Sequence, residues 1–193
     1  DLEELRQNKN NKEFFQNLFN ECSNLMQTIM NLSQPVIAEV CGIAAAAGCQ
    51  LVASCDLAVA SENASFMTPG VNIGLFCSTP MVAVSRNISR KKIMEMLLTG
   101  ESMSAKDAVD YGLINHCVPI NQLQDKTMSL ANLIASKPIS TVKIGKEAFY
   151  KQVEMPISEA YNYTSEVMAK NMLELDAHEG ISAFLEKRSP EWK

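Results

Sequence analysis

The first regular pattern of hydrophobic and polar positions in the chain runs from Glu13 to Ser33. Apolar side chains recur there every three or four residues, which is the spacing of one face of an α-helix. We therefore predict a long amphipathic helix, and we assign its stripe of Phe, Leu and Met side chains to the core and not to a ligand surface. The preceding residues 6–12 are polar, with several Asn and Lys, and are predicted to form a solvated loop.

After Pro35 the helical spacing gives way to short apolar runs. Residues 36–40 and 56–60 are mostly apolar and too short for typical helices, so we predict two strands. A third short segment covers residues 66–69, and a glycine-containing loop begins at Gly70. This order predicts a βαβ-like unit.

Four consecutive alanines, Ala44 to Ala47, lead through Gly48 between the two strands. Alanine is the best helix former, so the run predicts a helix that continues to Val52 once Gly42 has ended the first strand. A helix N-terminus presents unpaired backbone N–H groups and a partial positive charge, and small residues let a ligand oxygen approach them. Taken alone, the residues favour close packing over a ligand site, because alanine-rich helix starts often serve packing only.

Helical patterns dominate the chain after residue 78. The Thr-Pro pair that begins at Thr79 predicts one helix start, and a further helix begins after Ser89 and stops at Gly100. Ser104 is predicted to cap a short helix in a capping box in which Asp107 takes the place of glutamate. The remaining predicted elements are a strand at 113–118 and helices at 120–136, 138–152, 156–174 and 177–187, separated at Pro138, Pro156 and Asp176.

Composition limits the classes of function. The chain has 193 residues, 47% of them hydrophobic, and a formal net charge of −5. This length and composition suit one domain with a substantial core. The mild acidity gives no sign of the basic surface that nucleic acids or anionic membranes select, so we expect neither as a partner. No apolar run approaches the length of a membrane-spanning helix.

The six cysteines lie inside apolar runs, without the paired spacing of a metal site. We predict that they are small buried hydrophobes in a reducing compartment, and we expect neither disulfides nor a metal ion. The sequence also lacks a P-loop, a dinucleotide-binding GxGxxG fingerprint and the GxSxG elbow of serine hydrolases, so those sites are not expected.

Four segments resemble the crotonase superfamily, the enoyl-CoA hydratases and isomerases. They are PVIAEVCGIAAAAGCQLVASCDLAVAS at 35–61, FMTPGVNIG at 66–74, TGESMSAKDAVDYGLINHCVP at 99–119 and EGISAFLEKR at 179–188. The resemblance implies an α/β fold, a crotonase-like spiral of ββα units at residues 1–118, with a C-terminal helical region of the same domain at 119–193. It also implies that further strands precede Asp1 in the complete domain, and that the helical region builds homotrimers or hexamers.

Crotonases bind an acyl-CoA thioester, as substrate or ligand and not as a cofactor. They stabilise the enolate oxygen with two backbone N–H groups, which form an oxyanion hole. The resemblance places one of these donors at Ala47, with Ala45 and Gly48 beside the substrate, and the other on the residue before Asp1. It implies no cofactor and no metal.

The resemblance also marks three positions at which family members carry acids. Hydratases have glutamates at the positions of Gln50 and Gly70, and isomerases have an acid at the position of Ser78, so none of the three positions is acidic in this chain. The amide of Gln50 can hold a water molecule but cannot exchange a proton near neutral pH. General acid–base groups contribute roughly 10²–10⁴-fold each, so we expect ordinary two-glutamate hydration to be slow. We expect Gln50→Glu together with Gly70→Glu to raise it.

Other residues near these positions are candidates for substitute roles. We favour core packing for Cys49 and Cys77 and a role for Asn72 in satisfying the loop backbone. Lys187, in the terminal EKR, matches a position that lies near the nucleotide end of CoA in relatives. The alternative is a solvated helix end, since a lysine near a helix C-terminus is also favoured by the helix dipole.

Three functional hypotheses follow. The first is an acyl-CoA enzyme of the hydratase/isomerase class that works through non-standard groups. The second is a catalytically weak or inactive crotonase that binds acyl-CoA or a protein partner, and the third is an interaction protein without the ligand. The small-residue helix start argues against the third, and the missing acids favour the second over the first. We expect a mitochondrial matrix location for a eukaryotic source and a cytoplasmic one for a bacterial source.

Overall fold

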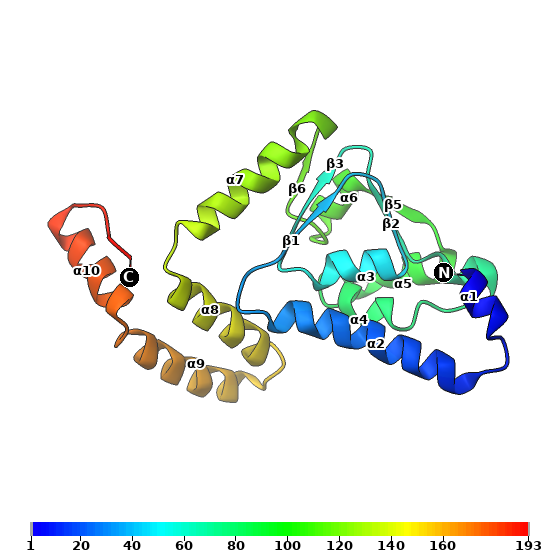
Figure 1. The fold of residues 1–193 in the computed structure, drawn as a ribbon, viewed down its shortest axis with the longest axis horizontal. Helices are drawn as coiled ribbons and strands as arrows, with labels where there is room; N and C mark the ends of the chain where they lie inside the picture. Colours follow the sequence, from blue (N-terminus) through cyan, green and yellow to red (C-terminus); the bar gives the residue numbers. More distant parts are fainter. Residues whose placement is uncertain (1, 193) are drawn as a thin grey trace. The chain divides into compact units, whose positions relative to one another are not determined.

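The computed structural model describes residues 2–192 (Figure 1). The chain divides into two compact units, one made of residues 2–30 and 36–127 and the other of residues 31–35 and 128–192. The first unit contains both β-sheets, and the second is helical.

The first unit contains two small three-stranded sheets. One sheet is parallel and has the order β1-β3-β6, with strands β1 (Ile37–Val40), β3 (Leu57–Ser61) and β6 (His116–Val118). The other has the order β2-β4-β5, with strands β2 (Ile43–Ala45), β4 (Ser65–Met67) and β5 (Ser102–Ser104). In the second sheet β2 is parallel to β4, and β4 is antiparallel to β5. The strands predicted at 36–40 and 56–60 are thereby confirmed to within a residue.

Helices pack around these sheets. The long helix predicted from Glu13 is confirmed as α2 (Lys12–Asn31), and it lies beside α3 (Ala47–Ser54) (Figure 1). α3 packs against α4 (Pro80–Val84), and α5 (Arg90–Thr99) packs against the 3₁₀ helix η1 (Pro69–Ile73). The other helical segments are α1 (Leu2–Gln7), α6 (Ala105–Asp110), the 3₁₀ helix η2 (Ile120–Gln122) and α7 (Leu123–Ala135).

The core of the first unit lies around the two sheets and α3. Its side chains Cys49, Val59, Phe66, Val84 and Met96 are each 2% exposed or less. The apolar stripe of α2 contributes less to this core than the sequence predicts. Only Met26 of that helix is fully buried; Phe19 and Leu25 are exposed, and the other apolar positions of the stripe are half-buried.

The alanine run begins as a strand, which corrects the helix predicted from Ala44 onward. Residues Ile43, Ala44 and Ala45 form β2 and pair in register with Ser65, Phe66 and Met67 of β4, and the helix starts only at Ala47. Helix propensity is worth at most about 1 kcal/mol per residue. Strand pairing over three residues and burial of the Ala44 side chain outweigh it.

The predicted helix ends agree with the structure better than the helix predicted from the alanine run. Ser89 caps α5 by accepting a hydrogen bond from the N–H of Lys92 at 3.4 Å, and Gly100 ends the helix with a φ of 68°. Ser104 caps α6 by accepting one from the N–H of Asp107 at 3.1 Å. The capping box is incomplete, because the Asp107 carboxylate accepts a bond from the Ser104 hydroxyl at 2.6 Å instead of reaching its backbone.

Two element boundaries differ from the sequence predictions. The loop was predicted to begin at residue 6. Because α1 extends to Gln7, the loop begins two residues later than predicted. The strand predicted at 113–118 is reduced to its last three residues, because Leu113 and Ile114 both donate their N–H groups to the carbonyl of Ala108 and close the turn after α6.

The second unit contains α8 (Ile139–Gln152), α9 (Ile157–Asn171) and α10 (Leu175–Glu186). The helix break predicted at Asp176 is wrong, because Asp176 lies within α10, is buried and accepts a hydrogen bond from Ser140 of α8 at 2.8 Å. After α10 the chain folds back, and Trp192 donates its indole N–H to the carbonyl of Ser136 at 3.0 Å. Within residues 2–192, every helix is too short or too polar to cross a membrane.

Candidate functional site

The N-terminus of α3 presents an open backbone donor. Ala47 is the first residue of the helix, and its N–H has no hydrogen-bond partner among residues 2–192. No side chain caps this helix, and a Cβ placed on Gly48 would meet no atom within 4 Å. Ala45 ends the neighbouring strand β2. The structure thus brings Ala45, Ala47 and Gly48 together around an unpaired N–H at the partly positive end of a helix.

Gln50 lies on the same helix but is buried. Its side chain is 4% exposed, and its Oε1 accepts a hydrogen bond from the thiol of Cys22 on α2, with a sulfur-to-oxygen distance of 3.8 Å. The amide is therefore held against α2. Sequence reasoning missed this partner, because the two residues are 28 positions apart and neither carries a local signal of the contact.

Gly70 is enclosed by the loop that follows it. Its N–H lies 3.4 Å from the Sγ of Cys77, and its carbonyl accepts a hydrogen bond from the N–H of Leu75 at 2.9 Å. A Cβ at Gly70 would lie 2.9 Å from both the Sγ of Cys77 and the carbonyl oxygen of Leu75, which is closer than real Cβ contacts. A glutamate at this position therefore requires movement of backbone as well as of a side chain. The increase in hydration rate that we expect from Gln50→Glu with Gly70→Glu therefore also depends on whether the loop can move to accept a side chain at position 70.

Cys49 and Cys77 are buried, at 0% and 8% exposure, which confirms the prediction that they pack in the core. Burial raises the pKa of the Cys49 thiol to about 12. The neighbouring Cys77 raises this pKa further, and a hydrogen bond with the backbone of Met67 lowers it. At neutral pH Cys49 is therefore a neutral thiol, and thiols in that form are poor nucleophiles and poor bases.

Ser78 and Asn72 occupy the outer part of the loop. The hydroxyl of Ser78 is exposed and donates to the carbonyl of Phe76 at 3.4 Å. The loop-backbone role predicted for Asn72 is wrong, since its amide forms no hydrogen bond with the described residues and packs instead over Gly100, at whose Cβ position its Nδ2 would lie 2.6 Å away. Asn72 therefore fits η1 against the end of α5.

Lys187 belongs to the second unit. It follows α10 as an exposed C-cap in the left-handed conformation, with a φ of 57°. Within the part of the chain that the structure describes, its ammonium group forms no ion pair. The next residue, Arg188, is by contrast bound to Glu179 by two bonds of 2.6 and 2.9 Å, and these bonds raise the pKa of its guanidinium.

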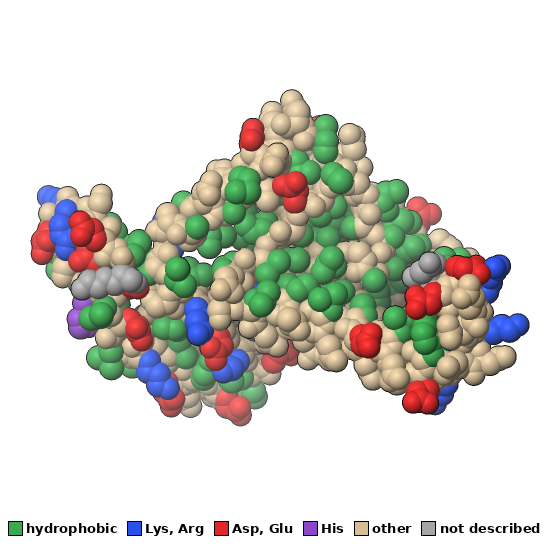
Figure 2. Space-filling model, in the orientation of Figure 1, with side chains coloured by type: hydrophobic (Ala, Val, Ile, Leu, Met, Phe, Trp, Pro, Cys, Tyr) green, Lys and Arg blue, Asp and Glu red, His purple; other side chains and the backbone are tan. Residues whose placement is uncertain are grey.

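Apolar side chains are exposed on the segments that carry the site. Figure 2 shows hydrophobic side chains gathered over the middle of the first unit, where Figure 1 draws α3. Exposed apolar side chains on the segments that carry the site include Ile43, Leu51, Leu75 and Phe76, each at least 40% exposed. Such a surface is suited to an acyl chain or to another protein surface.

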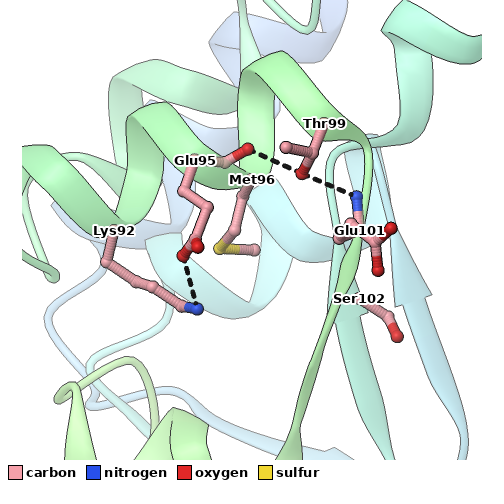
Figure 3. A pocket seen from close by; sticks show the side chains of 6 residues that line it. All are labelled: Lys92, Glu95, Met96, Thr99, Glu101 and Ser102. Atoms are coloured by element: carbon pink, nitrogen blue, oxygen red, sulfur yellow. Dashed lines mark hydrogen bonds and ion pairs between the residues drawn. The ribbon is translucent and has the colours of Figure 1, made fainter.

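A separate hollow of about 320 Å³ lies between α5 and the start of β5 (Figure 3). Its polar groups are largely satisfied by one another: the ammonium of Lys92 lies 2.8 Å from the carboxylate of Glu95, and the hydroxyl of Thr99 donates to the carbonyl of Glu95 and accepts from the N–H of Glu101 (Figure 3). None of the residues predicted from sequence to form the site lines it. No grouping of three or more His, Cys, Asp or Glu side chains suited to a metal ion occurs in residues 2–192.

Comparison with known proteins gives a consistent result. The family model described as enoyl-CoA hydratase/isomerase matches residues 1–193. The human mitochondrial enoyl-CoA hydratase domain-containing protein 3 is 50% identical over 192 residues, which is 100% of this chain and 63% of the relative. Carnitinyl-CoA dehydratase of Escherichia coli is 36% identical over 171 residues, covering 86% of this chain and 65% of the relative. The chain thus spans just under two thirds of the length of these relatives.

Solved structures agree with the sequence relatives. The crystal structure of the human enoyl-CoA hydratase domain-containing protein 3 has a TM-score of 0.96 and 50% identity, covering 100% of this chain and 76% of that one. An enoyl-CoA hydratase from Mycobacterium smegmatis has a TM-score of 0.93 and 51% identity, covering 94% and 70%. The crotonase fold implied by the sequence motifs is thereby confirmed for this chain.

The enclosure of Gly70 leads to a prediction about stability. We expect Gly70→Ala to lower the free energy of unfolding by about 1–3 kcal/mol, because the new methyl group overpacks the loop against a backbone carbonyl. Gly48→Ala is the matched control: it adds the same methyl group where nothing lies within 4 Å, and it should raise stability by up to about 1 kcal/mol through helix propensity. Urea unfolding of both variants measures the difference. Equal changes in the free energy of unfolding for the two variants would show that the loop at 70–77 moves to accept a methyl group without cost.

The buried state of Cys49 leads to a second prediction. In the native protein at pH 8, iodoacetamide should modify the exposed Cys41 and leave Cys49 and Cys77 unmodified, because alkylation needs an accessible thiolate. Peptide mass spectrometry before and after denaturation in urea provides the comparison. Rapid native labelling of Cys49 would contradict the burial described here and would restore that thiol as a candidate catalytic group.

Proposed function

The chain belongs to the enoyl-CoA hydratase/isomerase family, and we propose that it binds an acyl-CoA thioester with the carbonyl oxygen at the N-terminus of α3. The observation that carries this proposal is the unpaired N–H of Ala47, which is exposed and flanked by residues without bulk. A hydrogen bond from that N–H, together with the positive end of the helix dipole, stabilises negative charge on a carbonyl oxygen. The second donor of such a hole is expected on the residue that precedes Asp1.

We propose that the protein binds the acyl-CoA thioester and hydrates it by the two-glutamate route slowly or not at all. Neither Gln50 nor Gly70 can give or take a proton, and the burial of Cys49 keeps its thiol neutral. The Oε1 of Gln50 also accepts a hydrogen bond from the thiol of Cys22 at 3.8 Å, which occupies one of its acceptor sites. The exposed hydroxyl of Ser78 is the one polar group at the three acid positions that is open to solvent, and it supports the alternative of an enzyme with non-standard groups only weakly.

The second unit supports the further proposal of a homotrimer or hexamer. Its helices, and the turn between α9 and α10, carry large apolar side chains with little cover in a single chain, namely Ile139, Ile157, Phe184 and, in the turn, Leu173, each at least 77% exposed. Helices with such exposed apolar residues are typical of subunit contacts. The human, frog, rat and mouse relatives are named as mitochondrial, and we extend a mitochondrial location to this chain for a eukaryotic source.

The proposed function is tested by proton NMR of crotonyl-CoA in D₂O with the full-length protein. We expect the vinyl signals to broaden without being lost, which shows binding without turnover. Ala47→Pro should weaken binding by at least about 2- to 12-fold, because proline removes the N–H and also restricts the backbone of Ala46 before it. Ala47→Gly keeps that N–H and should retain most of the binding. Loss of the vinyl signals would establish real chemistry, and sharp unchanged signals would exclude this ligand.

Lys187 gives an independent prediction about the nucleotide end of CoA. Lys187→Gly should raise the free energy of unfolding by about 0.5–1 kcal/mol, because glycine adopts the left-handed C-cap conformation without steric penalty. The same change should weaken CoA binding by up to about 5-fold at low salt if the ammonium faces the phosphates. Lys91→Gln, which removes an exposed charge on α5, is the matched control. Equal weakening by the two variants in isothermal titration would show that only net charge matters.

A further inference from the structure

The side chain of Gln50 carries a hydrogen-bonding group that the fold leaves unused. The residue is 4% exposed, and its Oε1 accepts the thiol hydrogen of Cys22 at 3.8 Å. Its Nε2, which carries two N–H donors, forms no hydrogen bond with any residue from 2 to 192. Polar side-chain groups on buried residues nearly always have a partner, because leaving one without a partner destabilises the fold.

The unpaired nitrogen of Gln50 borders open space. Among the described residues, the side-chain nitrogen and oxygen atoms that are fully buried without a partner belong to Thr68 and Asn171. The Nε2 of Gln50 has no partner and is not one of these atoms, so solvent reaches it. An otherwise enclosed side chain therefore presents two donors at an accessible position.

The geometry of α3 places these donors beside Ala47. The Cα–Cβ bonds of an α-helix tilt toward its N-terminus, and residues three positions apart share a face. Gln50 follows Ala47 by three residues, so its side chain extends over the turn that Ala47 begins. The amide donors of Gln50 and the unpaired N–H of Ala47 therefore belong to the same end and the same face of the helix.

Cys22 determines which end of the amide is free. It lies on α2, which runs beside α3 (Figure 1). A thiol donates one hydrogen and its sulfur accepts only weakly, so it pairs with the oxygen of the amide and not with the nitrogen. The two atoms branch from one planar carbon, so the nitrogen points away from the thiol when the oxygen faces it. The side chain thus offers donors to a ligand while its acceptor is directed at Cys22.

A ketone oxygen on the acyl chain matches this arrangement. In a 3-oxoacyl thioester one methylene group separates the ketone from the thioester carbonyl, so the two oxygens suit two neighbouring donors. A ketone oxygen only accepts hydrogen bonds, whereas a hydroxyl group also needs an acceptor for its own hydrogen. A carboxylate at position 50 would present acceptors only and would repel the ketone oxygen.

We infer that Gln50 is a specificity-determining residue that favours 3-oxoacyl-CoA over acyl-CoA without an oxygen at C3, and that Cys22 is the positioning residue that orients its amide. The inference rests on the proposed function, since the thioester carbonyl must lie at Ala47 for the C3 oxygen to reach Gln50. It deepens that function by naming the class of acyl group.

Isothermal titration of the full-length protein with acetoacetyl-CoA and with butyryl-CoA tests the preference. The two ligands share the CoA moiety and the acyl length and differ in the oxygen at C3. The wild type should bind acetoacetyl-CoA about 2- to 12-fold more tightly, which is the range for one added hydrogen bond. Gln50→Leu should abolish this preference. Gln50→Glu, which is nearly isosteric, should reverse it, and the effect of its added charge on the CoA moiety cancels in the ratio of the two Kd values.

Substitutions on α2 separate the role of Cys22 from general effects. Cys22→Ala should reduce the preference, because the amide is then free to turn, and Cys22→Ser should keep most of it, because a hydroxyl group also donates. Gln27→Leu, at an exposed position of α2, is the matched control and should leave the ratio of Kd values unchanged.

The outcomes distinguish failure of the inference from failure of the proposed function. Equal Kd values for the two ligands in the wild type would overturn the inference, and so would a preference that both Gln50 variants retain. A preference that Cys22→Ala leaves at its full size would overturn the positioning role of Cys22. Failure of the wild type to bind either ligand would overturn the proposed function and the inference with it.

Discussion

The change from strand to helix at a single residue is the constraint on which the candidate site depends. β2 must stay paired with β4 for Ala44 to remain in the core, and α3 must begin immediately afterwards for Cys49 and Val52 to reach the same core. No residues are left for a connecting turn. The chain therefore concentrates the change of direction at Ala46, and the helix that follows starts with a donor that nothing in residues 2–192 satisfies. Core packing thus produces the feature that a ligand can use.

The polar positions around this helix form one packed assembly. Cys77 and Cys49 of α3 belong to the same buried core, and the sulfur of Cys77 also accepts a hydrogen bond from the N–H of Gly70. The loop at 70–77 is in this way joined to the helix through a thiol that is itself buried. Residues that share partners in this manner do not respond independently to substitution. The effect of a substitution at position 50 or 70 therefore depends on the residues at the other positions.

Much of the fold was predictable from sequence because its signals are local. The helix ends at Ser89 and Gly100 follow from a hydroxyl cap and a left-handed glycine, and both require only a few neighbouring residues. The strand at Ile43–Ala45 was missed because its pairing partners lie more than twenty residues away and override alanine's helix propensity. For the site, the position of Ala47 came from the family motif. The positive φ of Ala46 and the closure over Gly70 depend on the direction of particular backbone groups, and no sequence pattern specifies these.

Positions 50 and 70, at which the resemblance implies glutamates in hydratases, differ in how readily they could accept a carboxyl group. Glutamine at position 50 differs from glutamate by one atom at almost constant volume, and its Oε1, which accepts the Cys22 thiol, has a counterpart in either residue. Position 70 is different, since a side chain there must displace the carbonyl oxygen of Leu75, and no rotamer change moves a backbone atom. A single substitution can restore a carboxyl group at position 50, whereas position 70 also requires a new course for the loop. The closed loop at position 70 therefore agrees with the proposal that the site holds a thioester carbonyl and adds water to a double bond slowly or not at all.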